Sequence, residues 1–447
     1  MARAKKETAL TPEERLQAAL VPDWEWPYKL PENWCWTTVG AINQYVGISA
    51  DPTKAKNKTF ELYSVPSSAD NYPEIVLGAD IGSTKQSVKK GDVLLCKINP
   101  RINRVWKVSK YTDHSLLASS EWIVIRNSGL ISNYLMWCFR SPYFRGYMLS
   151  NVSGVGGSLM RAQPKFVQGY PVPVPPLAEQ QRIVDRIESL FAKLDEAKEK
   201  AQAVVDSFET RKAAILHKAF TGELTAKWRE AHGVSIDNWK TTRFDSVAAI
   251  RSNLVDPAEY QSFPHIAPDN IEKKTGVLLE YHTIAEDGVT SGKHRFYSGQ
   301  ILYSKIRPYL SKAVVVDFDG LCSADMYPIE AYQNERCLWY YMLSDEFLLQ
   351  ASTAGSRSVL PKINQKELSA LTVHLPTNDR EQEEIARILD ELFDKEQQTK
   401  EAAEVVLDQI GLMKKSILAR AFRGELGTND PSEESAVELL KEIIRRG

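Results

Sequence analysis

Two stretches of the sequence place basic side chains beside proline and aromatic residues in a matching order. Residues 97–107 read KINPRINRVWK, and residues 305–312 read KIRPYLSK. An Arg guanidinium can donate two parallel hydrogen bonds to a guanine edge, whereas a Lys ammonium suits a phosphate as a compact charge. A solvated surface loop would have the same composition. Nucleic-acid binding is therefore a hypothesis that depends on the elements that position these stretches.

A search for catalytic motifs finds only weak candidates. An adenine methyltransferase needs an acidic or Asn residue followed by two prolines and an aromatic residue, and NPRI at 99–102 lacks the second proline and the aromatic residue. GVGG at 154–157 is a poor cofactor loop, and there is no P-loop. Asp269, Glu272 and Lys274 lie too close in sequence for a nuclease metal site, and the seven histidines lack metal-ligand spacing. We expect no catalytic residue, no metal and no cofactor bound by this chain.

The composition is that of a soluble protein with at least two domains. The chain has 447 residues, and no apolar run approaches the roughly 18 residues that cross a bilayer. The N-terminus has no apolar segment typical of a secretory signal, and the five cysteines are scattered. We therefore expect a cytoplasmic protein that contacts no membrane.

Charge is distributed unevenly along a chain whose net charge is only −2. Residues 30–175 hold 16 Lys and Arg against 9 Asp and Glu, a net charge of +7. Residues 234–376 hold 14 against 17, a net charge of −3. The first segment can attract phosphates by its overall charge, whereas the second depends on local basic clusters.

The hexapeptides AFTGEL (219–224) and AFRGEL (421–426) end two long helical patterns that repeat at an offset of 202 residues. Each pattern starts after a proline-rich stretch, contains no further proline and spaces its apolar residues alternately by four and three. We expect two helices of about 40 residues each, ended by Gly222 and Gly424. The apolar residues of each pattern form a stripe, or seam, along one side of the helix. Two matched seams predict that the helices pair antiparallel, although ordinary core packing would explain either seam alone.

The predicted seam is interrupted by three polar residues, Arg211, Glu396 and Thr399. The pairing residues are Ile183, Ile187, Leu190, Leu194, Val204, Phe208, Ile215, Ile385, Leu389, Leu392, Val406, Ile410 and Ile417.

The segments between the helices also repeat. GDVLLCKINPRINRVW (91–106) matches GQILYSKIRPYLSKAV (299–314), and ASSEWIVI (118–125) matches CSADMYPI (322–329). Alternating apolar residues predict half-buried strands in these segments, and a helix follows in the first. The fold class is therefore mixed α/β, with two similar domains separated by two long antiparallel coiled-coil helices in a pseudo-two-fold internal repeat.

The chain resembles the specificity subunit of type I restriction-modification systems. The resemblance rests on this organisation and on the phrases PLAEQQRIVDRIESLF, KAFTGELTAKWR and ILARAFRGEL. The resemblance covers nearly the whole chain. It implies two target-recognition domains that each read one half of a split, asymmetric site on double-stranded DNA. It also implies that the helices dock two modification subunits, with restriction subunits joining through the complex. S-adenosylmethionine, ATP and Mg are then expected on partner subunits.

With this resemblance, the chain divides into six parts. We predict an N-terminal extension with a short helix (1–29), domain 1 (30–175), spacer helix 1 (176–225), domain 2 (226–376), spacer helix 2 (377–427) and a C-terminal helical tail (428–447).

The candidate DNA-binding residues come from the matched loops and from the stretches near the glycine-rich segments at 153–158 and 354–358. The repeat places Lys97, Arg101 and Arg104 where Lys305, Arg307 and Lys312 lie. The full set is Lys97, Arg101, Arg104, Lys107, Arg161, Lys165, Lys305, Arg307, Tyr309, Lys312, Arg357 and Lys362.

Other functions stay open at this point. The chain could be a standalone restriction-modification enzyme, or a fragment of one, with an unrecognised catalytic fold. It could also be a scaffolding coiled coil that does not bind DNA. Residues 11–20 and 431–446 both favour helices, which could pack together or dock partner subunits.

Overall fold

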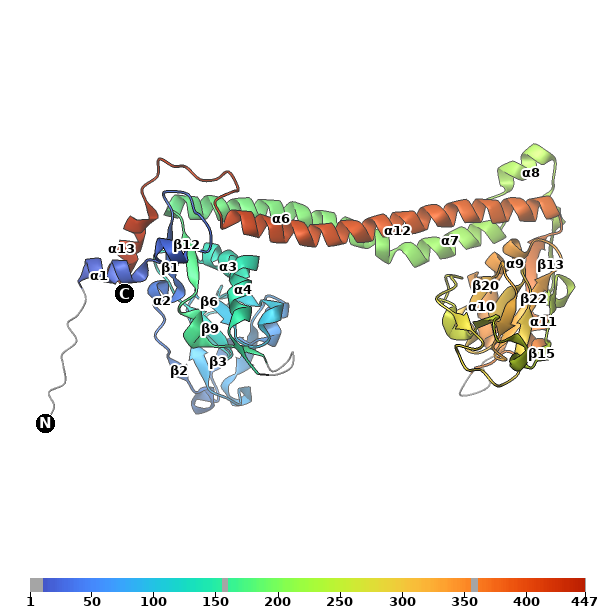
Figure 1. The fold of residues 1–447 in the computed structure, drawn as a ribbon, viewed down its shortest axis with the longest axis horizontal. Helices are drawn as coiled ribbons and strands as arrows, with labels where there is room; N and C mark the ends of the chain where they lie inside the picture. The colour runs from blue at the N-terminus through green and yellow to red at the C-terminus, as the bar shows by residue number, and fades with distance from the viewer. Residues whose placement is uncertain (1–10, 155–159, 355–360, 447) are drawn as a thin grey trace. The chain divides into compact units, whose positions relative to one another are not determined.

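A computed structural model describes residues 11–154, 160–354 and 361–446. The chain forms two compact units, the first from residues up to 200 together with residues from 406 onward, and the second from residues 201–405 (Figure 1). Each unit holds one mixed α/β domain and parts of the long helices. The fold class expected from the repeat is confirmed.

Short strands build the domain of the first unit. They are β1 (Cys35–Thr38), β2 (Ser49–Ala50), β3 (Thr59–Tyr63), β4 (Glu74–Leu77), β5 (Lys85–Ser87), β6 (Val93–Cys96), β7 (Val105–Lys107), β8 (Ser115–Ala118), β9 (Trp122–Ile125), β10 (Val152–Ser153), β11 (Arg161–Ala162) and β12 (Pro171–Val174). A five-stranded sheet has the order β2-β5-β8-β3-β4, and a three-stranded sheet has the order β7-β6-β9. β1 pairs antiparallel with β12, with Cys35 opposite Val174, and so joins the two ends of the domain.

Strand β6 lies between two hydrophobic cores. Val93 and Leu95 face a core that includes helices α3 (Ser132–Arg140) and α4 (Pro142–Ser150). Leu94 faces the other core, shared with the five-stranded sheet. Successive side chains of a strand point to opposite faces, so β6 is buried on both faces and not half-buried as its sequence suggested. The short helices α2 (Val39–Ile42) and α5 (Pro164–Val167) complete the domain.

The domain of the second unit repeats this plan. Its strands are β13 (Trp239–Arg243), β14 (Ala248–Ile250), β15 (Leu254–Val255), β16 (Pro264–Ile266), β17 (His282–Thr283), β18 (Lys293–Phe296), β19 (Ile301–Ser304), β20 (Ala313–Val315), β21 (Gly320–Cys322), β22 (Met326–Ala331) and β23 (Thr372–Pro376). Its helices are α9 (Glu335–Met342), α10 (Asp345–Ala354) and α11 (Gln365–Ala370). The sheets have the orders β14-β22-β19-β20 and β15-β18-β21-β16-β17, while β13 pairs with β23. β19 is buried between two cores, as β6 is.

The long helices are α6 (Leu177–Asp206), α7 (Phe208–Phe220) and α12 (Asp379–Ala421). The second predicted helix is confirmed as one element of 43 residues, but the expectation of one uninterrupted first helix is wrong. At the break, the Ser207 hydroxyl donates to the carbonyl of Ala203 at 2.6 Å, and Arg211 donates to the carbonyl of Val204 at 3.2 Å. The Ala203 carbonyl also accepts the Ser207 amide at 3.1 Å, and a Ser hydroxyl that bonds to the carbonyl four residues before it often bends a helix. Arg211 also pairs with Glu396 at 2.7 Å, so two of the polar residues in the seam contact each other.

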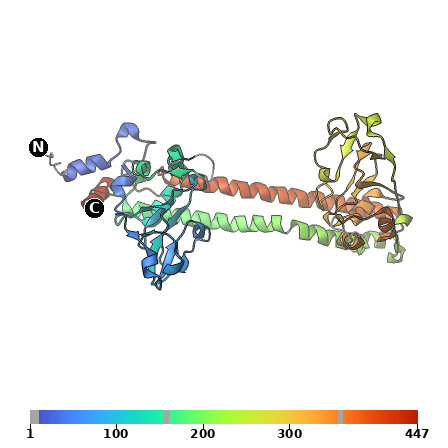
Figure 2. The ribbon, with the colours of Figure 1, turned by 90° about the horizontal axis from the view of Figure 1, so that it is seen from below.

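The long helices pair within each unit. In the first unit, the start of α6 and the end of α12 lie side by side in both views, and Lys414 Nζ lies 4.9 Å from the ring centroid of Phe191 (Figure 1 and Figure 2). In the second unit, Lys212 Nζ lies 5.4 Å from the ring centroid of Phe393. Both residues of the second contact differ by 202 from those of the first. The same contact between the end of one helix and the start of the other therefore recurs, as antiparallel pairing requires.

Most of the predicted seam is buried or half-buried. The buried residues are Ile183, Ile187, Phe208, Ile385, Leu389 and Ile410. The half-buried residues are Leu190, Leu194, Val204, Ile215, Leu392 and Ile417. Val406 is 41% exposed, so its prediction as a pairing residue is wrong, and the neighbouring Leu407 is half-buried instead. A helix with 3.6 residues per turn drifts against a 3.5-residue repeat, which moves the seam by one position here.

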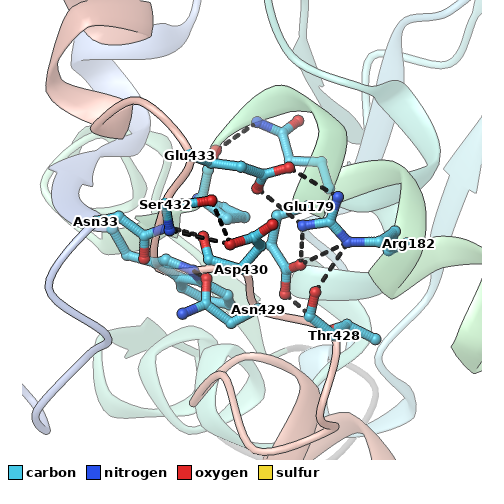
Figure 3. Close-up of polar contacts among 11 residues, drawn as sticks. Asn33, Glu179, Arg182, Thr428, Asn429, Asp430, Ser432 and Glu433 are labelled. Atoms are coloured by element: carbon cyan, nitrogen blue, oxygen red, sulfur yellow. Dashed lines mark hydrogen bonds and ion pairs between the residues drawn. The ribbon is translucent and has the colours of Figure 1, made fainter.

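Each hexapeptide ends a helix beside the first turn of the other long helix. In the first unit, Thr428 Oγ1 donates to Glu179 of α6 at 2.7 Å (Figure 3). In the second unit, Thr225 Oγ1 donates to Glu381 of α12 at 2.8 Å. Both glutamates are fully buried and lie 202 residues apart. We call this arrangement the helix joint, and the chain builds it twice.

Charge and backbone conformation complete each helix joint. Arg182 pairs with Glu179 at 2.9 Å, and Arg229 of α8 (Ala226–His232) pairs with Glu381 at 2.7 Å. Burial raises the pKa of Glu179, although Thr428 and Arg182 act in the opposite direction. Both hexapeptide glycines have a left-handed backbone, with φ of 78° at position 222 and 74° at position 424, as expected for helix ends.

The C-terminal segment returns to the N-terminal part of the first unit. Helix α13 (Ala436–Arg446) packs beside α1 (Pro12–Ala19) in both views (Figure 1 and Figure 2). Leu440 of α13 belongs to the same core as Trp34, and Arg182 binds Glu433 at 2.8 Å (Figure 3). The packing of the two terminal segments that the sequence left open is confirmed.

Candidate nucleic-acid interface

Both domains carry the same hairpin loop between two paired strands. In the first domain, β6 leads through the 3₁₀ helix η5 (Pro100–Ile102) to β7, and in the second, β19 leads through η10 (Pro308–Leu310) to β20. The β6–β7 and β19–β20 pairs are both antiparallel. The basic stretches that suggested nucleic-acid binding are these two loops.

The two loops share an unusual backbone. The residues that flank each 3₁₀ helix are left-handed, with φ of 46° at Asn99 and 54° at Asn103, and φ of 48° at Arg307 and 46° at Ser311. A left-handed backbone costs an L-residue such as Arg roughly 1 kcal/mol or more. The same strained turn at the same place in both domains indicates that the loop shape is required.

A second segment closes each loop from the side. Ile98 forms a β-bridge with Arg161, and Ile306 forms one with Lys362. In both domains the next amide along the loop donates at 2.8 Å to a carbonyl of that segment. The equivalence of Arg161 and Lys362 therefore rests on backbone geometry.

A carboxylate lies opposite each of these two bridging basic residues. Glu121 Oε1 is 3.4 Å from Arg161 Nη2, and Asp325 Oδ1 is 3.1 Å from Lys362 Nζ. The backbone carbonyl of each acid also accepts a hydrogen bond from the amide of the first lysine in the loop, at 2.9 Å in the first domain and 3.0 Å in the second. Each acid thus connects the hairpin loop with the segment beside it.

The hairpin loop, the segment that bridges to it and the acid between them are together called the loop frame. Four predicted DNA-binding residues of the first domain gather on it. Arg101 is exposed at the tip of the loop, and its carbonyl accepts a hydrogen bond from Arg145 of α4. Lys97 and Arg104 are half-buried in the loop, and Arg161 lies on the segment beside it.

Two further predicted residues of the first domain have other surroundings. Lys107 Nζ donates to Asn133 Oδ1 of α3 at 2.5 Å. Lys165, in α5, places its Nζ 4.7 Å from the ring centroid of Phe166. The structure does not bring Lys107 into the loop cluster, because its side chain is directed to α3.

In the second domain the frame gathers Lys305, Arg307, Tyr309 and Lys362. Tyr309 is 48% exposed at the tip, and Arg307 is exposed beside it. Lys305 Nζ lies 5.2 Å from the ring centroid of Tyr327. Burial lowers the pKa of His294, and the charge of Lys305 acts in the same direction.

The last two predicted residues of the second domain are placed differently. The side chain of Lys312 is only 14% exposed, and its Nζ donates to the carbonyl of Pro268 at 2.6 Å. The Lys312 ammonium therefore interacts with the backbone inside the domain. Arg357 lies outside the described residues.

The structure also corrects one equivalence. The sequence comparison placed Arg101 against Arg307, but the two 3₁₀ helices superpose Arg101 on Tyr309 and Asn99 on Arg307. The tips of the two loops therefore differ in chemistry, with a guanidinium in one domain and a phenol in the other.

Sequence reasoning overlooked Glu121 and Asp325 as members of the site. The aligned strings ASSEWIVI and CSADMYPI already place these two acids at the same position. Phosphate binding favours basic residues, so the composition of the loops gives no signal for an acid.

Other kinds of site receive no support from the described part of the chain. Over residues 11–154, 160–354 and 361–446, His, Cys, Asp and Glu side chains form no group of three that could hold a metal ion. Over the same ranges, no helix is long and apolar enough to cross a membrane. The suspected nuclease residue Asp269 has a fully exposed side chain, 3.8 Å from Lys312.

Comparison with known proteins agrees with this arrangement. The family model of the type I restriction modification DNA specificity domain matches residues 47–205 and 236–406, once in each half of the chain. The EcoDI specificity subunit of Escherichia coli, from a type I restriction enzyme, is 36% identical over 370 residues, covering 76% of this chain and 82% of that protein. The EcoKI specificity subunit of Escherichia coli K12 is 25% identical over 358 residues, covering 72% and 73%.

Solved structures share the fold. A chain from a type I restriction-modification system aligns with a TM-score of 0.71 at 20% identity, covering 90% of this chain and 100% of that chain. The HsdS subunit of Thermoanaerobacter tengcongensis aligns with a TM-score of 0.62, with the same identity and coverage. Two matches to the domain model and a relative similar over most of both chains show that this protein belongs to the specificity subunits of type I restriction-modification systems, which recognise DNA and do not catalyse its modification.

Proposed function

We propose that this chain reads a bipartite, asymmetric DNA site, one half with each domain. The observation that carries the proposal is the pair of equivalent loops. One backbone frame recurs in both domains but presents Arg101 and Arg161 in the first, and Tyr309 and Lys362 in the second. Base edges are distinguished by the side chains that reach them, so one frame with two sets of side chains suits two different half-sites.

Charge supports DNA binding to different degrees in the two domains. Residues 30–175 carry a net charge of +7, which attracts phosphates over the whole domain surface. Residues 234–376 carry −3, so the second domain depends on the local group of Lys305, Arg307 and Lys362. The strained backbone at Arg307 supports the loop as the functional element, because strain of this kind concentrates at binding sites.

Helix α12 offers a surface for partner subunits. Leu412 is 63% exposed, Met413 49% and Val406 41%, all outside the buried seam. Val406 and Met413 lie seven residues apart and therefore on one side of the helix, and exposed apolar side chains grouped on one side can mark an interaction site. We assign this surface to two modification subunits, which would bring restriction subunits into the complex. S-adenosylmethionine, ATP and Mg would then be bound by those partners and not by this chain.

Reconstitution tests the proposal. We expect the purified chain with added modification subunits and S-adenosylmethionine to methylate adenines in one bipartite motif, and the chain alone to methylate nothing. Methyl transfer by the chain alone would favour the alternative, a standalone restriction-modification enzyme. A scaffolding coiled coil would show no salt-dependent shift of DNA, whereas phosphate contacts predict a shift that weakens as salt rises.

A further inference from the structure

The acids Glu121 and Asp325 have the same place in the two domains. Each follows the central strand of a five-stranded sheet, β8 in the first domain and β21 in the second. The backbone carbonyl of each accepts the amide of the first loop lysine, and the carboxylate of each pairs with the bridging basic residue. A surface acid kept for solubility would not reproduce the same ion pair at the same place in both domains. The repetition indicates that the carboxylate belongs to the working part of the frame.

The ion pairs Glu121–Arg161 and Asp325–Lys362 are exposed enough to contact a ligand. The side chain of Glu121 is 29% exposed and that of Arg161 52%, while Asp325 and Lys362 are 41% and 46% exposed. Partly exposed ion pairs contribute little to stability. Glu121 Oε2 is buried without a hydrogen-bond partner in the described part of the chain, so the carboxylate meets Arg161 through Oε1.

A carboxylate beside a basic side chain changes what that side chain can recognise. A long basic side chain without a fixed neighbour samples many rotamers and meets phosphates as readily as bases. When a carboxylate holds one of its donors, the remaining donors point in a defined direction. Direction is what discrimination between base edges requires.

We propose that Glu121 and Asp325 are positioning residues, and that the pairs Glu121–Arg161 and Asp325–Lys362 set the base preference at one position in each half-site. The inference deepens the proposed function and rests on it. Arg161 and Lys362 make the contact with the base, and the two acids act through them.

The two pairs suit different bases to different degrees. The guanidinium of Arg161 keeps donors for both O6 and N7 of guanine after Glu121 has taken one. Lys362 is a single charged centre, so its contact discriminates less sharply. We therefore expect a guanine at the position read by Arg161 and a weaker preference at the position read by Lys362.

Glu121→Gln and Asp325→Asn test the proposal in the complex reconstituted with modification subunits. Both changes keep the shape of the side chain and remove its charge. Methylation rates are measured on a library of sites in which every base of the motif is varied. We expect Glu121→Gln to reduce discrimination at one base position of one half-site by roughly 5- to 100-fold, and Asp325→Asn to act on the other half-site only.

Arg161→Ala should relax the same base position as Glu121→Gln, and the double variant should relax it no further. Asp113→Asn is the matched control, because Asp113 forms an ion pair with Lys110 at the same 3.4 Å but in the connection between β7 and β8, outside the β6–β7 loop. It should leave the motif unchanged. Thermal unfolding of each variant is recorded, since a purely structural role would lower stability without changing base preference.

Three outcomes would overturn the inference. In the first, Glu121→Gln preserves discrimination at the position that Arg161→Ala relaxes. In the second, Glu121→Gln slows methylation equally at all sites. In the third, Glu121→Gln loses its fold, and Asp325→Asn, which keeps its fold, leaves discrimination at its own half-site intact. The wild-type complex separates these results from a failure of the proposed function, because only the latter would abolish the bipartite motif in the wild type.

Discussion

At the residue scale, the left-handed backbone of Arg307 has a consequence for stability. Its φ is 48°, and the equivalent residue of the first domain is Asn99, a residue type that tolerates this conformation far better than Arg. Arg307→Asn should therefore raise the free energy of unfolding by about 0.5–1 kcal/mol. It should also weaken binding to the half-site read by the second domain. Chemical denaturation and DNA titration measure the two effects.

Arg101→Asn is the control, because Arg101 lies inside η5 and not at a left-handed position. It should leave stability within about 0.5 kcal/mol of the wild type while weakening the other half-site. A lower unfolding free energy for Arg307→Asn would show that the Arg307 backbone is not strained.

Lys212 should make the stability of the fold depend on pH. Lys212 is buried, its Nζ donates to the carbonyls of Lys274 at 2.8 Å and Thr275 at 3.1 Å, and burial lowers its pKa to about 8. The folded pKa lies below the unfolded value of 10.5, so the unfolded chain binds more protons between these values and stability rises with pH across the window.

The comparison with Lys212→Met isolates this effect from other titrating groups. Between pH 8 and 10.5, the wild type should gain up to roughly 3 kcal/mol of unfolding free energy relative to the variant. Denaturant titrations at several pH values give the difference. Parallel pH profiles for both proteins would mean that Lys212 keeps an ordinary pKa in the fold.

At the element scale, the structure separates two apolar positions that the heptad pattern treated alike. Phe208 is 8% exposed and lies under Lys400, whose Nζ is 5.0 Å from the ring centroid, whereas Val406 is 41% exposed. Phe208→Lys should lower the unfolding free energy by about 3–5 kcal/mol, because it removes a buried ring and places two ammonium groups together. Val406→Lys should change it by less than about 0.5 kcal/mol. Thermal or chemical unfolding measures both, and similar losses in the two variants would contradict the observed seam.

These elements show how far sequence reasoning reaches. Periodicity predicted the long helices, their antiparallel pairing and the repeated domains, because a seam must be buried wherever it lies. It did not predict the break at Ser207, where the side chains of Ser207 and Arg211 donate to helix carbonyls, nor the exposure of Val406, which depends on helical drift. In the site, composition pointed to the basic loops. The role of Glu121 needed three segments brought together by the fold.

For the whole molecule, the proposal that each domain reads its own half-site predicts how the recognised motif changes when one domain is exchanged. The strand pair β1 and β12 closes the first domain at its base, so residues 30–175 can be replaced by the equivalent domain of a relative without a new junction inside a sheet. The exchange should change one half of the methylated motif and preserve the other. Sequencing of methylated positions in cells that carry the exchanged subunit provides the test.

An exchange of residues 234–376 is the reciprocal experiment and should alter only the other half. If either exchange changed both halves, base preference would depend on both domains together, and the division of labour would be wrong.

The route of the chain through its cores has a consequence for biosynthesis. Trp34 and Trp36 share a core with Phe422, Leu440 and Ile443, so the first unit draws on both ends of the sequence, whereas the second unit is continuous from 201 to 405. On the ribosome, the domain that emerges first lacks its last packing partners until translation is nearly complete. Chains that end shortly after residue 405 and have been released from the ribosome should therefore protect residues 226–376 from protease while residues 30–175 are still cleaved. The domain made second becomes native first.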